Sequence, residues 1–232
     1  MLLWIREPGP GEGERPGTVS PALARPGTTL PEAANTAQFW LLTGSFFLVA
    51  LAINGAVAHV VPLLTDHGLS TESATGVMAI FGLATLSGRL LAGFLVDRIY
   101  APYVASVFFL GPVAGFALLA TASGVFPAFG VILMGLGLGT EVDLIAFLIS
   151  RYFGQRAFGS LYGYFFMIFG IGTGVGPFLG GMTFDIAGSY NPALIGAGAS
   201  LVLAVILINR LGPCSYPAEA HFSPALRPQP AG

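Results

Sequence analysis

Charged residues are scarce in this 232-residue chain: they make up 9% of it, whereas hydrophobic residues make up 54%. A soluble domain carries about 25% charged residues, so this chain has too few of them to cover a water-facing surface. The mean hydropathy is +0.79. This composition excludes an ordinary soluble domain and indicates a protein that is solvated by the lipid bilayer.

Lysine is absent and cysteine nearly so, and both absences restrict the function. All nine basic residues are arginines, and a net charge of −2 does not predict a nucleic-acid partner. The single Cys214 excludes an intramolecular disulfide. The motifs H-E-x-x-H, G-x-S-x-G and Walker A are also missing, so we expect neither an enzyme nor a metal or cofactor site.

Six apolar stretches of membrane-spanning length fill the middle of the chain. Each is about twice as long as a membrane β-strand, so the predicted fold class is an all-α membrane protein with six transmembrane helices. We divide the chain into a cytoplasmic linker or tail (1–36), a transmembrane domain (37–210) and a Pro-rich tail (211–232). The expected spans are 37–63, 73–96, 102–122, 126–150, 158–184 and 192–209.

All arginines outside these spans fall on one side of the membrane. By the positive-inside rule, this distribution predicts that both termini are cytoplasmic, in a plasma or inner membrane. The arginines on this side are Arg6, Arg15, Arg25, Arg98, Arg151, Arg156, Arg210 and Arg227.

Three charged residues lie inside the expected spans and are therefore candidates for function. Arg89 and Asp143 each lie about 12 Å inside the cytoplasmic end of a span, and Glu141 lies about 3 Å deeper. Pairing of Arg89 with one carboxylate would reduce the cost of desolvation. Glu141 and Asp143 are about 200° apart around a helix, so one can face Arg89 while the other faces a cavity or a neighbouring helix.

The role of these charges has two interpretations. Arg89 offers two parallel donors that suit a substrate carboxylate, whereas a permanent buried ion pair would only fix the packing of helices. Glu141 and Asp143 have either a structural or gating role or contact a proton or substrate. Asn54 and His59 in the first span are weaker candidates, since a histidine near a helix end is more often packed or interfacial.

Glycines are concentrated in MGLGLG (134–139) and GIGTGVGPFLGG (170–181). Neither segment has the G-x-G-x-x-G spacing of a nucleotide loop, and no strand precedes them. Small residues four apart let membrane helices approach closely, so we expect packing faces here. In the second segment these faces are Gly170 with Gly174, and Gly172 with Gly176 and Gly180.

The spans also differ in polarity in a repeated way. The third and sixth spans contain no charged residue, whereas the first, second and fourth contain polar ones. Two groups of three spans are the pattern expected of an inverted three-plus-three transporter repeat.

Several segments resemble the second half of the major facilitator superfamily, in its branch of monocarboxylate transporters and oxalate:formate antiporters. SGRLLAGFLVDRI (87–99) resembles the family's loop motif between helices 8 and 9, and HVVPLLTDHGLS (59–70) resembles the end of helix 7. GLGTEVDLIAFLISRYFGQRAFGSLYG (137–163) and GTGVGPFLGG (172–181) resemble helices 10 and 11. The family fold has twelve helices, so the resemblance implies a second six-helix half, or a second copy, as partner.

The resemblance also implies roles for individual residues. In that branch an arginine of helix 8, four residues before a glycine, binds the substrate carboxylate, and Arg89 with Gly93 has this spacing. Asp97 and Arg98 match the cytoplasmic loop motif, whose implied role is gating. The chain departs from some relatives at Thr85, where they have an aspartate, and in lacking a lysine in helix 11.

The function we expect is secondary active transport of a small organic anion, a monocarboxylate, by alternating access and with protons as the candidate coupling ion. Arg89 and Asn54 would contact the substrate, and Glu141 or Asp143 would balance charge or carry the proton. The expected partners are the lipid bilayer, the anion, protons and a second half. The alternative is a non-transporting remnant or a subunit of a membrane complex.

Overall fold

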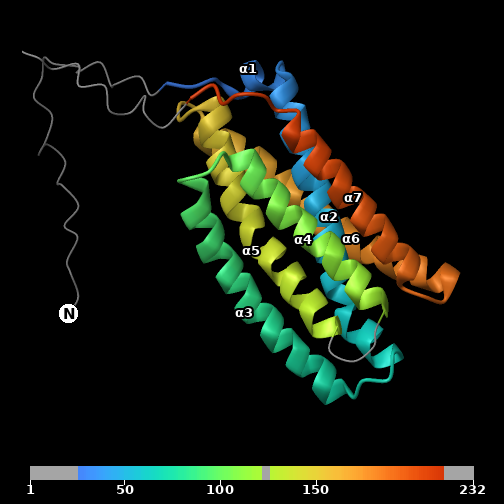
Figure 1. Cartoon of the computed structure of the whole chain (residues 1–232). Coiled ribbons are helices and arrows are strands. Elements are labelled where there is room, and N and C mark those ends of the chain that lie inside the picture. The colour runs from blue at the N-terminus through green and yellow to red at the C-terminus, as the bar shows by residue number, and fades with distance from the viewer. Residues whose placement is uncertain (1–25, 122–125, 217–232) are drawn as a thin grey trace, which may run out of the picture.

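The computed structural model describes residues 26–121 and 126–216, which form a bundle of six long helices preceded by one short helix (Figure 1). The six long helices are apolar enough to span a membrane, which confirms the predicted fold class. The helices are α1 (Leu30–Ala34), α2 (Ala37–Asp66), α3 (Thr71–Val96), α4 (Ala101–Thr121), α5 (Phe126–Phe153), α6 (Phe158–Ala187) and α7 (Asn191–Asn209).

Side-chain caps and a glycine define several helix ends. Thr36 accepts a hydrogen bond from the backbone N–H of Phe39 at 3.4 Å, and Ser70 caps α3 in the same way. α6 ends at Gly188, whose φ of 63° lies in the left-handed region that favours glycine. α2 and α5 each continue three residues beyond the predicted span, because hydropathy marks the apolar part of a helix and not its capped end.

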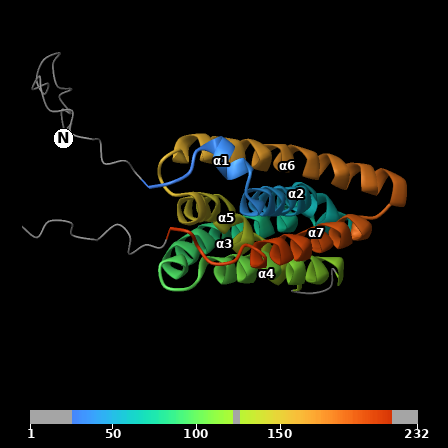
Figure 2. The same cartoon turned by 90° about the horizontal axis from the view of Figure 1, so that it is seen from above.

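The bundle consists of two similar groups of three helices, α2–α4 and α5–α7. α2 packs along α6 as α5 packs along α3, and α2 packs on α7 as α5 packs on α4. In Figure 2, α2 and α5 lie between α6 and the pair α4 and α7. This correspondence of contacts is the one expected of the three-plus-three repeat that the distribution of charged residues predicted.

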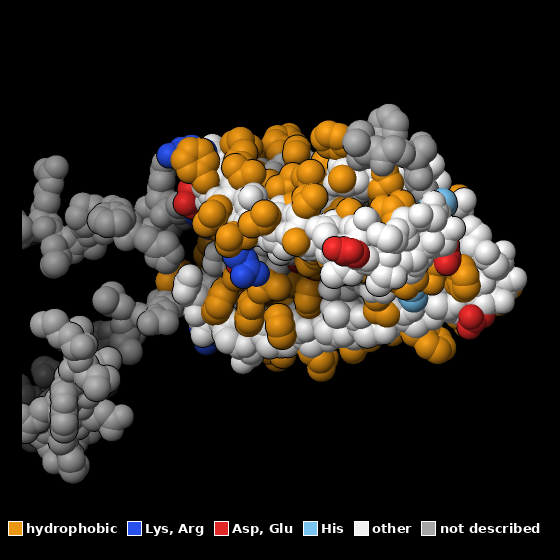
Figure 3. Space-filling model, turned by 90° about the horizontal axis from the view of Figure 1, so that it is seen from below, with side chains coloured by type: hydrophobic (Ala, Val, Ile, Leu, Met, Phe, Trp, Pro, Cys, Tyr) orange, Lys and Arg blue, Asp and Glu red, His pale blue; other side chains and the backbone are white. Residues whose placement is uncertain are grey.

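The core lies along α2 and α5. Half of the apolar window of α2 and 56% of that of α5 are buried, compared with 22% for α3 and 28% for α6. Hydrophobic side chains cover much of the outer surface that Figure 3 shows, as a lipid-facing helix bundle requires. Polar groups on α2 and α5 are therefore held between helices, whereas those on α3 and α6 are nearer the surface.

The segments that flank the bundle meet at one end of it, beside the turn between α5 and α6 (Figure 1). The backbone N–H of Thr28 donates to the carbonyl of Phe153 at 2.8 Å, and that of Tyr216 donates to the carbonyl of Arg151 at 2.9 Å. The Tyr152 hydroxyl donates to the Gly212 carbonyl at 2.7 Å. The rest of the expected linker and tail, residues 1–25 and 217–232, lies outside the described residues.

Candidate functional site

α3 and α5 are in backbone contact because glycines remove the side chains between them. A Cβ atom at Gly139 of α5 would lie 2.9 Å from the backbone nitrogen of Arg89 on α3. A Cβ atom at Gly88 of α3 would overlap the backbone of α5, and Gly135 makes a similar contact one turn away. Small residues allow this approach. As a result, the side chains of Arg89 and Asp143 project from α3 and α5 next to each other.

Arg89 and Asp143 form the predicted ion pair, with 3.2 Å between Nε and Oδ2. The two side chains are 55% and 43% exposed, respectively, so the pair lies on the face of the bundle and not in its core. Basic and acidic side chains stand within a largely hydrophobic surface in Figure 3. The pair is therefore open to a ligand or to a second helical unit, unlike the permanently buried pair that was the alternative interpretation.

Glu141 points away from this pair and is completely buried. Its Oε2 accepts a hydrogen bond from Nδ2 of Asn54 on α2 at 3.4 Å, while Oε1 has no partner within the part of the chain that the structure describes. The Asn54 amide also donates to the carbonyl of Ala50 at 3.1 Å. The two carboxylates thus face different helices, as predicted, and Asn54 contacts Glu141 instead of the ion pair.

A groove of about 460 Å³ extends from Asp143 toward the end of the bundle where the arginines lie. It is lined by Gly93 of α3, by Asp97 directly after that helix, by α5 and by the start of α6. Arg98 does not line it: its guanidinium lies 3.5 Å from the centre of the Phe94 ring. The structure therefore brings Gly93 and Asp97 together with Asp143 and leaves Arg98 on the outer surface.

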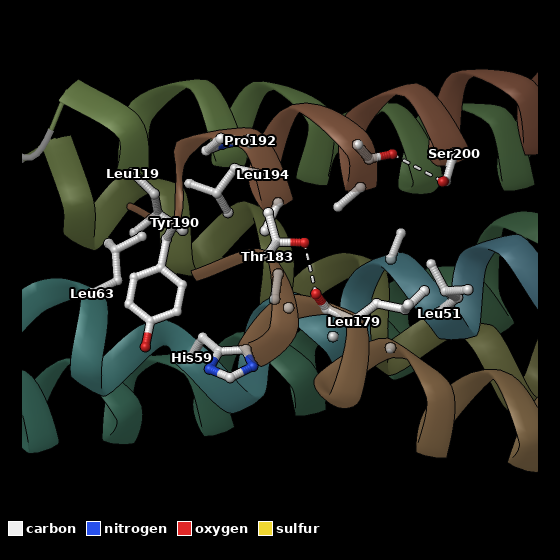
Figure 4. A pocket seen from close by; sticks show the side chains of 18 of the residues that line it. Leu51, His59, Leu63, Leu119, Leu179, Thr183, Tyr190, Pro192, Leu194 and Ser200 are labelled. Carbon is white, nitrogen blue, oxygen red and sulfur yellow. Dashed lines mark hydrogen bonds between the residues drawn. The ribbon is translucent and has the colours of Figure 1, made fainter. Parts of the chain in front are cut away.

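A second cavity, of about 270 Å³, lies between α2, α6 and α7 toward the opposite end of the bundle (Figure 4). His59 lines it, with Nε2 2.9 Å from the carbonyl oxygen of Pro177 and the ring centre 5.2 Å from that of Tyr190. The hydroxyls of Thr183 and Ser200 donate to carbonyls of their own helices. Most of the lining is apolar, and these polar groups have partners, so nothing here favours an organic anion.

Tyr190, in the turn between α6 and α7, also lines this second cavity. Burial raises the pKa of the Tyr190 phenol, and the negative charges of Asp66 and Asp185 raise it further. No pattern in the sequence indicated this cavity, because its walls come from α2, α6 and α7 with Leu119 of α4, and these helices are far apart along the chain. His59 was a weak candidate for function there, and its hydrogen bond is consistent with the packed role.

α2 and α6 make the contact that corresponds to that of α3 and α5. Gly172 and Gly176 of α6 face the backbone of α2, and Gly180 faces the ring of His59, so this expected packing face is present. In the described chain, nothing lies within 4 Å of a Cβ atom at Gly170 or Gly174, so the other expected face makes no such contact. The four-residue spacing predicted both faces equally, and only tertiary contacts distinguish them.

Comparison with known proteins adds independent evidence. The family model described as Major Facilitator Superfamily matches residues 1–177. Monocarboxylate transporter 12-B of Danio rerio is 26% identical over 178 residues, which cover 74% of this chain and 37% of that protein. The uncharacterized MFS-type transporter YcxA of Bacillus subtilis is 33% identical over 140 residues, which cover 57% of this chain and 34% of that protein. The uncharacterized MFS-type transporter YhjX of Escherichia coli is 26% identical over 150 residues, which cover 62% of this chain and 37% of that protein.

These relatives are named as transporters, in agreement with the prediction that the chain is not an enzyme. The chain spans little more than a third of the length of the curated relatives it matches. Its six spanning helices, their repeated contacts and the family match agree with the resemblance found in its motifs. The chain belongs to the Major Facilitator Superfamily.

Proposed function

We propose that this chain is one six-helix half of a secondary active transporter that moves a small organic anion, a monocarboxylate, by alternating access. The observation that carries the proposal is the exposed Arg89–Asp143 pair. A guanidinium recognises carboxylates through two parallel N–H donors, and Asp143 shows that a carboxylate oxygen can reach Arg89. A substrate carboxylate would take the place of Asp143 or share Arg89 with it. The free-energy cost of this exchange is reduced because Arg89 and Asp143 are both partly exposed.

The groove beside the Arg89–Asp143 pair supports a role in gating for the residues at the cytoplasmic end of the groove. Asp97 and Asp143 line the same groove, so a change in the packing of α3 against α5 would alter both residues. We assign Asp97, with Arg98 next to it, to gating, and Arg89 with Asp143 to substrate binding and charge balance. We also propose that the protein lies in a plasma or inner membrane with both termini in the cytoplasm, an orientation that the segregation of arginines supports.

The partner that we propose for this chain is a second helical unit. The Arg89–Asp143 pair is covered on one side by its own helices and is open on the other. A cavity with two walls needs a second six-helix half or a second copy of this chain. The matched relatives are long enough to contain two such halves, since this chain spans 34–38% of their length.

Substitution of Arg89 by lysine tests the proposal. Arg89→Lys keeps the positive charge beside Asp143 but removes the planar pair of donors, so the fold is retained while carboxylate binding weakens. We expect uptake of radiolabelled formate, acetate or lactate by the membrane-embedded assembly to fall at least about tenfold, which corresponds to about 1.4 kcal/mol. Arg210→Lys, at the end of α7, is the matched control and keeps uptake. Unchanged uptake kinetics of Arg89→Lys would show that the assignment is wrong.

The alternative function is that of a non-transporting remnant or an assembly subunit. Its support is the open side of the Arg89–Asp143 pair, which a different membrane protein would cover in such a complex. The mass of the detergent-solubilised protein and uptake by the same assembly together separate the two functions. A dimer or a complex with another six-helix chain that takes up the anion supports transport, whereas a monomer or a complex without uptake supports the alternative.

A further inference from the structure

Glu141 is a carboxyl group in the core of the bundle without a cation beside it. Its exposed fraction is 0%, and its single hydrogen bond within the described residues is the one from Asn54 at 3.4 Å. Oε1 has no partner among residues 26–121 and 126–216. Glu141 is therefore unlike Asp143, two residues further along the same helix, which is partly exposed and paired with Arg89.

The helices packed against α5 bring no other charge to Glu141 in the described structure. α2 presents the neutral amide of Asn54, and α4 contains no charged residue. On α3, Arg89 is bonded to Asp143, on the other side of α5. On α6, the one acidic residue is Asp185, two residues before the end of the helix that is far from the arginines.

The remaining titratable group near this part of α2 is also occupied. His59 lies five residues beyond Asn54, and its Nε2 is bonded to the carbonyl of Pro177 on α6. His59 therefore faces the second cavity and does not contact Glu141. No described side chain is placed to neutralise a negative charge on Glu141.

An ionised carboxylate in such a place would be very unstable. An isolated charge in an apolar interior costs many kcal/mol, and such a group is paired or takes up a proton instead. A metal cation is a poor occupant, because hard cations need about six or more oxygen ligands and Oε1 has no hydrogen-bond partner among the described residues. A proton needs only the carboxyl oxygen itself.

We propose that Glu141, held by the Asn54 amide, is a proton-binding site separate from the Arg89–Asp143 pair, and that its proton is the one that moves with the anion. The coupling of this proton to the anion rests on the proposed function. On binding, a carboxylate and a proton from water form a neutral acid; on release, the proton returns to water and leaves the carboxylate. Oε1 is buried in this conformation, so exchange of the proton with water requires a change in the packing around Glu141.

Infrared difference spectroscopy on the purified full chain tests the protonation directly and needs no transport. We expect the carbonyl stretch of a protonated carboxyl group at neutral pH in the wild type. The band is lost in Glu141→Gln and retained in Glu72→Gln, a matched change in the first turn of α3. Absence of the band, or its persistence in Glu141→Gln, would overturn the proposal. If Glu141→Gln does not fold, Asn54→Leu is used: it shifts the band to higher frequency, and an unshifted band overturns the role of Asn54.

Uptake measurements test the coupling. In the membrane-embedded assembly we expect uptake of the radiolabelled monocarboxylate to rise at least about tenfold under an inward proton gradient. This dependence on the gradient is lost in Glu141→Gln and kept in Glu72→Gln. A gradient dependence that survives in Glu141→Gln overturns the coupling role. The infrared band without any uptake by the wild type contradicts the proposed function and leaves the proton site intact, so the two failures are distinguishable.

Discussion

The α3–α5 and α2–α6 interfaces are built in the same way but contain different polar groups. In both, glycines four residues apart place one helix against the backbone of the other: Gly135 and Gly139 in the first interface, Gly172 and Gly176 in the second. The first interface ends in the exposed Arg89–Asp143 pair. The second ends at a mostly apolar cavity where the hydrogen bond of His59 is internal.

This difference separates the requirements of the fold from those of function. Close backbone contact is present twice because the two groups of three helices pack alike. Of these two interfaces, as far as the described residues show, only the α3–α5 interface has an ion pair, in which a cation and a carboxylate face outward. The packing therefore repeats with the fold, whereas the side chains at the ends of the two interfaces differ, and the proposed function assigns anion binding to the α3–α5 interface.

The largest effects on stability should follow from adding one carbon at the packed glycines. Gly139→Ala and Gly176→Ala should each destabilise the protein by about 1–3 kcal/mol, because the new Cβ atom meets backbone atoms that cannot move aside. Unfolding midpoints of the detergent-solubilised variants measure this. Gly82→Ala on α3 and Gly174→Ala on α6, which meet nothing within 4 Å, are the matched controls. Equal stability of packed and control variants would contradict the close backbone contact, and a loss in only one of the two packed variants would contradict the equivalence of the two interfaces.

A smaller effect is expected one turn beyond Gly176. A Cβ atom at Gly180 would meet the ring of His59 at 2.7 Å and no backbone within 3.4 Å. The ring can rotate into the adjoining cavity, at the cost of its hydrogen bond to Pro177, which is worth about 1 kcal/mol. Gly180→Ala should therefore cost less than Gly176→Ala in the same unfolding experiment. A larger loss for Gly180→Ala would mean that the ring is held rigidly.

The smallest effect on stability should come from the ion pair itself. Asp143→Asn removes the charge of a pair whose members are about half exposed, so the loss should be no more than about 1 kcal/mol. The difference from the wild type should shrink as salt is added, because exposed charges are screened. Unfolding at low and high ionic strength measures it. A loss of several kcal/mol that does not respond to salt would indicate that the pair is structural.

Much of the fold was predictable from local chemistry. Apolar length fixed the six spans, the arginines fixed which loops share one end of the bundle, and helical geometry required Glu141 and Asp143 to face different neighbours. Whether Asp143 or Glu141 pairs with Arg89 depends on the orientation of α3 about its axis relative to α5. The glycine contacts between the two helices determine this orientation, and the spacing of residues along the sequence does not.

Other features depend wholly on tertiary structure. Gly170 and Gly172 have equally good spacing, yet only Gly172 contacts α2. The cavity beside His59 joins α2 to α6 and α7, and Tyr190 reaches it from the turn between α6 and α7. Such features arise where distant segments meet, so the pattern along one helix does not contain them.

Equilibrium binding of a radiolabelled monocarboxylate to the purified assembly is the most direct test that Arg89 recognises an anion. Formate, acetate and lactate serve as probes, with wild type, Arg89→Lys and Arg210→Lys compared at one pH and salt concentration. We predict that the wild type and Arg210→Lys bind at least one probe with equal affinity, and that Arg89→Lys binds it at least about tenfold more weakly. Equal affinity of the wild type and Arg89→Lys would contradict the assignment of Arg89 as the anion site.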